Sequence, residues 1–128
     1  MLKGHLKIAA VGALFLGLVV AASTNARGDS DHANYLTFSR AVALPGVELA
    51  AGTYIFSTPS NAMSNTIVRV SSRDGRTVYL TAFTRDVARP KGDNGKLIVS
   101  LGEAPAGAAR PVAAWFPIGE SSGHEFIY

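Results

Sequence analysis

The chain contains 128 residues and no cysteine, and its 12 Lys and Arg against 9 Asp and Glu residues give a formal net charge of +3. A chain of this length holds one modest domain, and without cysteine the stability of that domain depends on packing. Two of the basic residues, Lys3 and Lys7, precede a long uncharged run, so the remainder of the chain is close to neutral. This charge balance argues against nucleic-acid binding.

The beginning of the chain has the order of a secretory signal: a basic start, an apolar run and then small residues. As a helix, the apolar run Ile8–Ala22 would reach roughly 22 Å, which is short of the ~30 Å hydrocarbon core of a membrane. We therefore expect residues 1–26 to be a removed signal peptide and residues 27–33 a flexible leader. Residues 34–128 would form one exported domain, periplasmic or extracellular, whose only membrane contact would come through an uncleaved signal.

The segment Thr66–Phe83 is predicted to be a β-hairpin, because apolar and polar residues alternate along it. A three-residue loop at residues 73–75, with Gly75 in the left-handed conformation, places its apolar residues on one face, whereas a two-residue loop would mix the faces. That face is predicted to consist of Val68, Val70, Val78 and Leu80.

Further short segments have the composition or alternation of strands, and they are separated by Gly- and Pro-containing turns. These segments are Asn34–Val42, Thr53–Thr58, Lys96–Leu101, Val112–Phe116 and His124–Tyr128. Pro45-Gly46 fits the central positions of a type II turn, Asn94-Gly95 fits a tight turn, and residues 84–95 are predicted to be a polar connection. The pattern predicts an all-β fold: a single antiparallel sandwich or partly open barrel of about seven short strands after the signal helix.

Four short motifs stand out along the sequence: LPGVELAAGTY at residues 44–54, the Asp74-Gly75 hairpin, Ala114-Trp115-Phe116, and GHEFIY at residues 123–128. Together they resemble a family of small exported bacterial proteins of unknown function. It implies an all-β exported domain, and it supplies no catalytic residue to transfer to this chain.

The most reactive pair of side chains is His124 and Glu125, but neighbours in a strand point to opposite faces and cannot serve one site without a bulge. Ser121 and Ser122 lie nearby without the G-x-S-x-G sequence of a nucleophile elbow. We therefore expect no catalytic residue, no metal site, no cofactor and no enzymatic activity. A hydrolase that uses His124 with Glu125 or Asp86 is the remaining enzymatic alternative.

Two sets of side chains are candidates for binding. The first is aromatic and would either fill the core or line an apolar pocket for a ligand: Tyr54, Phe56, Tyr79, Trp115 and Phe126. The second is basic and would gather as an anion-binding rim at one end of the fold: Arg73, Arg76, Arg85 and Arg89. Interleaved acidic residues make a mixed, solvated rim the competing interpretation of the second set.

These observations favour an exported, non-enzymatic module that binds a partner protein, an envelope polymer or a small apolar ligand. The alternative is a structural envelope protein, including a small outer-membrane β-barrel, because Phe126 and Tyr128 alternate near the end of the sequence. The predicted strands are shorter than the roughly 9–11 residues that a membrane-crossing strand needs.

Overall fold

The computed structural model of the chain describes residues 22–24, 30–59 and 66–128, and these residues form an all-β fold. Its strands are β1 (Ala22–Thr24), β2 (Ser30–Phe38), β3 (Val42–Leu44), β4 (Val47–Leu49), β5 (Gly52–Pro59), β6 (Ile67–Ser72), β7 (Val78–Ala88), β8 (Val99–Leu101), β9 (Arg110–Trp115) and β10 (Ser122–Phe126). The described residues include no helix with the length and hydropathy of a membrane span. Ala22–Thr24 of the expected signal and residues 30–33 of the expected leader are strand residues, in β1 and β2, and the rest of these two segments lies outside the described residues.

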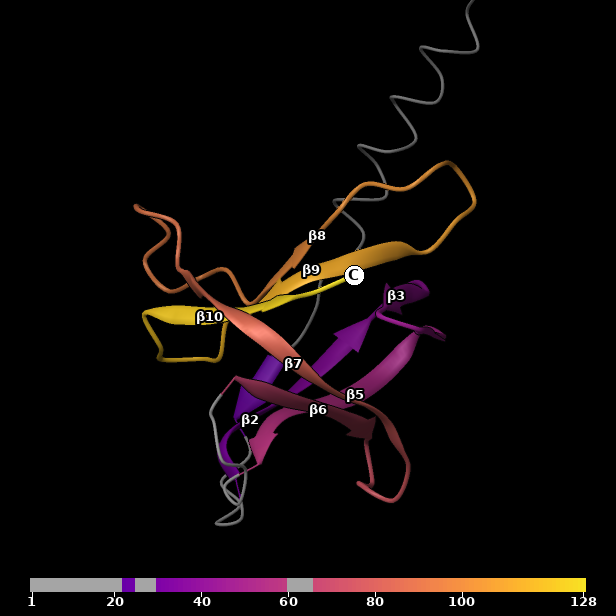
Figure 1. The fold of residues 1–128 in the computed structure, drawn as a ribbon, viewed down its shortest axis with the longest axis horizontal. Helices are drawn as coiled ribbons and strands as arrows, with labels where there is room; N and C mark the ends of the chain where they lie inside the picture. Colours follow the sequence, from indigo (N-terminus) through magenta and orange to yellow (C-terminus); the bar gives the residue numbers. More distant parts are fainter. Residues whose placement is uncertain (1–21, 25–29, 60–65) are drawn as a thin grey trace, which may run out of the picture.

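The strands form one mixed sheet that folds over itself into a sandwich-like shape and does not close into a barrel (Figure 1). The strand order is β1-β2-β5-β6-β7-β10-β9-β3-β4, with β8 paired to β9 beside this path. All pairs are antiparallel except β3 with β9, which run parallel through Val42↔Arg110 and Ala43↔Pro111. The prediction of a purely antiparallel sheet was wrong at this pair, because strands far apart in the sequence meet there.

β7 joins the two halves of the sheet. It is 11 residues long, and its first half pairs with β6 while its second half, Thr84–Ala88, pairs with β10. The prediction that residues 84–95 form only a connection was therefore wrong for Thr84–Ala88. The polar side chains of Arg85 and Asp86 are exposed on this strand.

The β6–β7 hairpin forms with a different register from the one predicted. Ser72 N–H donates to Thr77 O at 2.8 Å, so the loop is longer than three residues. Val70 pairs with Leu80 but Ser71 pairs with Val78, which leaves Tyr79 as the extra residue of a β-bulge. The bulge reverses the alternation, so Val78 is 52% exposed while Val68 and Val70 are fully buried.

The predicted turn chemistry is present. Gly75 has φ +77° and donates its N–H to Ser72 O at 2.8 Å. Gly46 has φ +75° after Pro45, and Asn94 and Gly95 have φ of +56° and +75°. These positive φ angles are the ones that a type II turn and a type I′ turn require.

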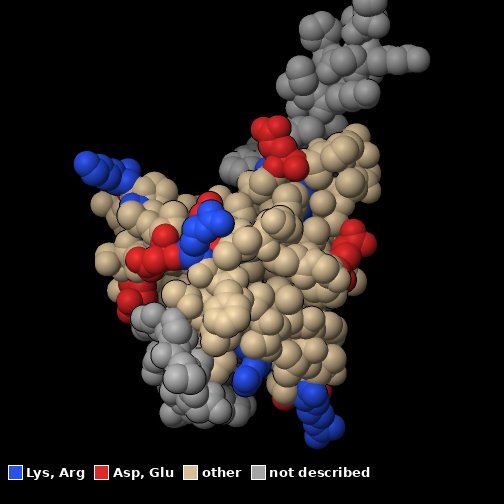
Figure 2. Space-filling model, in the orientation of Figure 1, with Lys and Arg blue, Asp and Glu red and all other residues tan. Residues whose placement is uncertain are grey.

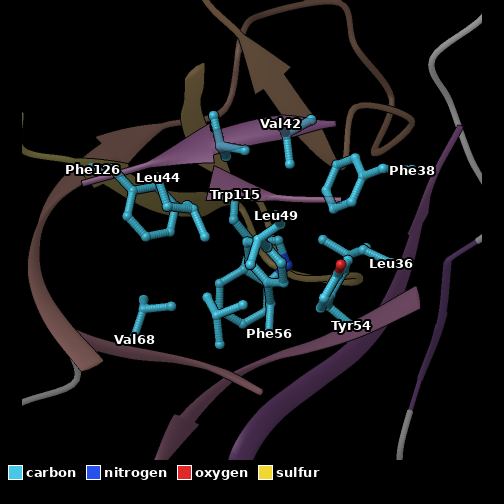
Figure 3. Close-up of a cluster of buried hydrophobic side chains, with 12 residues drawn as sticks. Leu36, Phe38, Val42, Leu44, Leu49, Tyr54, Phe56, Val68, Trp115 and Phe126 are labelled. Atoms are coloured by element: carbon cyan, nitrogen blue, oxygen red, sulfur yellow. The ribbon is translucent and has the colours of Figure 1, made fainter. Parts of the chain in front are cut away.

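The core lies between the two halves of the folded sheet, and both halves contribute to it (Figure 3). Phe56 from β5 is fully buried, and its ring centroid lies 5.9 Å from that of Trp115 and 6.3 Å from that of Phe126, both in edge-to-face geometry. Such contacts add to the free energy of burial. The aromatic rings therefore hold β5 against β9 and β10.

Gly123 in β10 is required for the close packing of this strand. A Cβ atom at this position would lie 2.5 Å from the Phe116 ring and 2.6 Å from Trp115 O. No side chain therefore fits at position 123 without a shift of its neighbours.

We expect Gly123→Ala to lower the free energy of unfolding by about 1–3 kcal/mol, because β10 must move away from the backbone of β9. Trp115 is the sole tryptophan, so urea unfolding followed by its fluorescence measures the change. Ser122→Ala, the neighbouring half-buried residue, is the control and should stay within about 0.5 kcal/mol of the parent. Equal stability of the two variants would contradict this account.

Candidate functional site

The structure packs four of the five candidate aromatic residues into the interior. Phe56 and Trp115 are fully buried, Phe126 is 4% exposed and Tyr54 is 8% exposed. Tyr54 donates its hydroxyl to Ala50 O at 2.6 Å, and burial followed by the nearby Tyr79 raises the pKa of Tyr54. Only Tyr79, at the bulge, is substantially exposed. Their burial supports core filling as the role of the other four rings.

The four candidate arginines do not gather at one place. Arg73 and Arg76 lie in the β6–β7 turn, whereas Arg85 and Arg89 lie in or just after the opposite half of β7. Arg85 is an exposed partner of Glu125 across the β7–β10 pair, with 4.0 Å between Nη1 and Oε1. Arg89 points inward, and its side chain is 9% exposed.

The Arg89 guanidinium connects two loops, the one between β7 and β8 and the one between β9 and β10. Its Nη1 donates to Asp93 Oδ2 at 2.8 Å and to Leu97 O, and its Nε donates to Glu120 O at 2.9 Å. Its central carbon lies 5.3 Å from the centroid of the Phe116 ring. This geometry uses the planar fork of donors that distinguishes Arg from Lys. Arg89 therefore serves the fold in this conformation, and its donors are directed at protein oxygens.

Asp93 is held as a carboxylate by its surroundings. Hydrogen bonds from Leu97 N–H, and then the hydrogen bond and charge of Arg89, lower its pKa from the ordinary value of 3.8. Because the pKa is lower in the folded state, the carboxylate adds stability above pH 3.8, and this contribution is lost as the pH falls through the folded-state pKa.

We expect Asp93→Asn to lower the melting temperature at neutral pH and to reduce the loss of stability on acidification. The measurement is thermal unfolding of parent and variant from neutral pH down to below pH 3.8. Glu103→Gln is the control, because it removes one carboxylate at another position. If the gap between the parent and Asp93→Asn stayed constant across this pH range, the carboxylate would not be the source of the effect.

A buried polar cluster centred on Asn34 joins β2 to the opposite half of the sheet. Its Oδ1 accepts hydrogen bonds from Trp115 Nε1 at 3.1 Å and from Ile118 N at 3.2 Å, and its Nδ2 donates to Ala33 O at 3.0 Å. Asn34 is 2% exposed. Buried donors without an acceptor are expensive, so this side chain fixes where β2 lies relative to β9.

We expect Asn34→Ala to lower the free energy of unfolding by about 2–3 kcal/mol, because the buried Trp115 N–H and the part-buried Ile118 N–H lose their acceptor. Thr37→Ala is the control, because it removes the part-buried hydroxyl pair with Thr53 at 2.8 Å and should change stability by about 0.5–1.5 kcal/mol. Denaturant unfolding separates the two. A smaller loss in Asn34→Ala than in Thr37→Ala would show that the cluster is dispensable.

His124 and Glu125 lie in β10 with different surroundings, as the strand geometry predicts. The His124 ring stacks on Trp115 with centroids 5.3 Å apart, and its Nδ1 lies 3.3 Å from Thr84 Oγ1. Glu125 is exposed beside Arg85. Asp86 is the register partner of His124. Within the described ranges, no group of three or more His, Cys, Asp and Glu residues is arranged to hold a metal ion.

The exposed apolar residues of β7 and its neighbours are the feature that the sequence interpretation missed. Phe83 is 68% exposed and pairs with half-buried Ile67. Extending the β7–β10 register by one residue from Phe126↔Thr84 brings Ile127, which is 44% exposed, beside Phe83. We call Ile67, Phe83 and Ile127 the outer patch.

The outer patch is surrounded by polar and charged groups. Figure 2 shows an uncharged area over the middle of β7, as located in Figure 1, with charged side chains around its margin. The Arg85–Glu125 pair lies next to Phe83 and Ile127 in the two strands. The sequence contains evidence for this patch. Thr81, Phe83 and Arg85 are two residues apart, so in a strand their side chains lie on the same face, and two of the three are polar.

Comparison of the chain with protein-family models, with curated proteins and with solved structures gives no match. The functional interpretation therefore depends on the geometry of the described residues and on the sequence.

Proposed function

We propose that this protein is an exported, non-enzymatic β-sandwich module that binds a partner protein through the outer patch. The observation that carries this proposal is the 68% exposure of Phe83 on a sheet face. Large aromatic side chains on protein surfaces are enriched in interfaces, where they contribute most of the binding free energy. The expected partner surface is an apolar hollow with polar edges.

The arrangement around Phe83 supports an interface of this kind. Ile67 and Ile127 widen the apolar centre, while Arg85 and Glu125 supply a charged margin. Protein interfaces have an apolar core and a polar rim, and rim charges mainly affect association rate and specificity. Full burial of one Phe side chain contributes roughly 1.5–3 kcal/mol.

The choice of a protein partner over a small apolar ligand follows from burial. Most of the candidate pocket residues pack against one another in the core, so little of their ring surface is available to a ligand. Export is supported by the basic start, the apolar run and the small residues of positions 1–26, and by the resemblance to small exported bacterial proteins.

The test is photo-crosslinking in exporting cells, with benzoylphenylalanine in place of Phe83. We expect a discrete covalent adduct whose partner is identified by mass spectrometry, and we expect Phe83→Ser to reduce capture of that partner at least tenfold. The stability of Phe83→Ser should stay within about 0.5 kcal/mol of the parent, because the side chain is exposed.

Ile118 provides the matched control, because it is an apolar residue that is 38% exposed in the loop between β9 and β10. Benzoylphenylalanine at this position should not give the same adduct, and Ile118→Ser should not reduce capture. No adduct at Phe83, or the same adduct at both positions, would remove the outer patch as the binding surface.

A further inference from the structure

β1 occupies the outer edge of β2, at one end of the strand order. It pairs antiparallel with β2 through Ala22↔Leu36, Ser23↔Tyr35 and Thr24↔Asn34. All three β1 residues fall inside the segment that we expect to be a signal peptide, residues 1–26. Part of the expected signal peptide therefore pairs with the sheet as an edge strand.

Removal of residues 1–26 would take away β1 and leave β2 as the edge of the sheet. Its backbone N–H and C=O groups on that side would then lack strand partners along Asn34–Leu36. An unpaired edge is a template for another extended chain, and proteins use this geometry to bind peptides by adding a strand.

We propose that signal removal turns the β2 edge into a docking site for an extended segment of another polypeptide, which runs antiparallel to β2 in the place of β1. The proposal rests on the export that is part of the proposed function, and it concerns a surface distinct from the outer patch. The incoming segment should carry small, uncharged side chains, as Ala22-Ser23-Thr24 does.

The restriction to small residues follows from the β1–β2 register. Leu36 and Asn34 are both 2% exposed, so their face of β2 is the interior one. In an incoming segment with the same register, the side chains opposite these two residues would share that face, so bulky or charged residues there would meet the core. The middle residue of the incoming segment would lie opposite Tyr35, on the other face of the sheet, so its size and charge are less restricted.

The β2 edge is also held in place from within. Asn34 is hydrogen-bonded to Trp115 and Ile118, and β2 pairs with β5 along most of its length. A strand that is already ordered loses little conformational entropy when a partner binds, which favours binding. In the precursor, the tethered β1 segment competes at an effective concentration in the ~mM range, and it keeps the edge closed until processing.

The probe is a fluorophore-labelled peptide, VAASTNA, which has the sequence of residues 20–26. It is titrated into the protein purified after export and into the full-length precursor purified from cells blocked in export. We expect the exported protein to bind at least tenfold more tightly than the precursor. VAAPTNA is the control peptide and should bind neither form, because proline replaces the central residue and removes one N–H donor.

Hydrogen exchange gives a readout that does not depend on peptide affinity. The amides of Asn34–Leu36 that face β1 should exchange slowly in the precursor, at least tenfold faster in the exported protein, and slowly again with saturating VAASTNA. The amides of Val68 and Val70, in the middle of the sheet, are the internal reference and should not change.

The outcomes separate the two proposals. An intact mass that includes residues 22–24 in the exported protein would overturn both the docking site and the removed signal. A processed protein that binds both peptides equally, or whose β2 amides stay protected without peptide, would overturn the docking site and leave the outer patch untouched.

Discussion

The fold depends on one long strand that belongs to both halves of the sheet. β7 hydrogen-bonds to β6 through its first half and to β10 through its second half. A strand that changes partners in this way makes a corner, where one layer turns into the other. The corner sets the two inner faces against each other, and Phe56, Trp115 and Phe126 fill the space between them. Without it, the core residues of β5 and β6 would face water.

The sequence predicted correctly those features that depend on a few neighbouring residues. The turns at Pro45-Gly46 and Asn94-Gly95 and the left-handed conformation of Gly75 need positive φ angles that Gly and Asn adopt at little energetic cost, so they were predicted correctly. The loop that contains Gly75 is longer than the predicted three residues. Burial of Val68 and Val70 was also predicted correctly, because alternation within one strand is a local property. The all-β class followed from the same local features.

The remaining features depend on contacts between distant parts of the chain. The bulge at Tyr79 shifts the β6–β7 register close to the turn, and it moves Val78 to the surface against the simple alternation. The inward position of Arg89 depends on Asp93 and on carbonyl groups from the loop before β10. Of the two proposed binding surfaces, the outer patch could have been predicted from the alternation of residues along β7, whereas the β1–β2 pairing could not.

The position of β10 has a consequence for biogenesis. Although it is the strand furthest along the sequence, it lies between β7 and β9 in the middle of its layer, and Tyr128 just beyond it reaches Val112 O and Ala43 O with its hydroxyl at 2.6 and 3.1 Å. That layer cannot be completed while this part of the chain is still being synthesised. The late arrival of the central strand therefore makes completion of this layer a late step in folding.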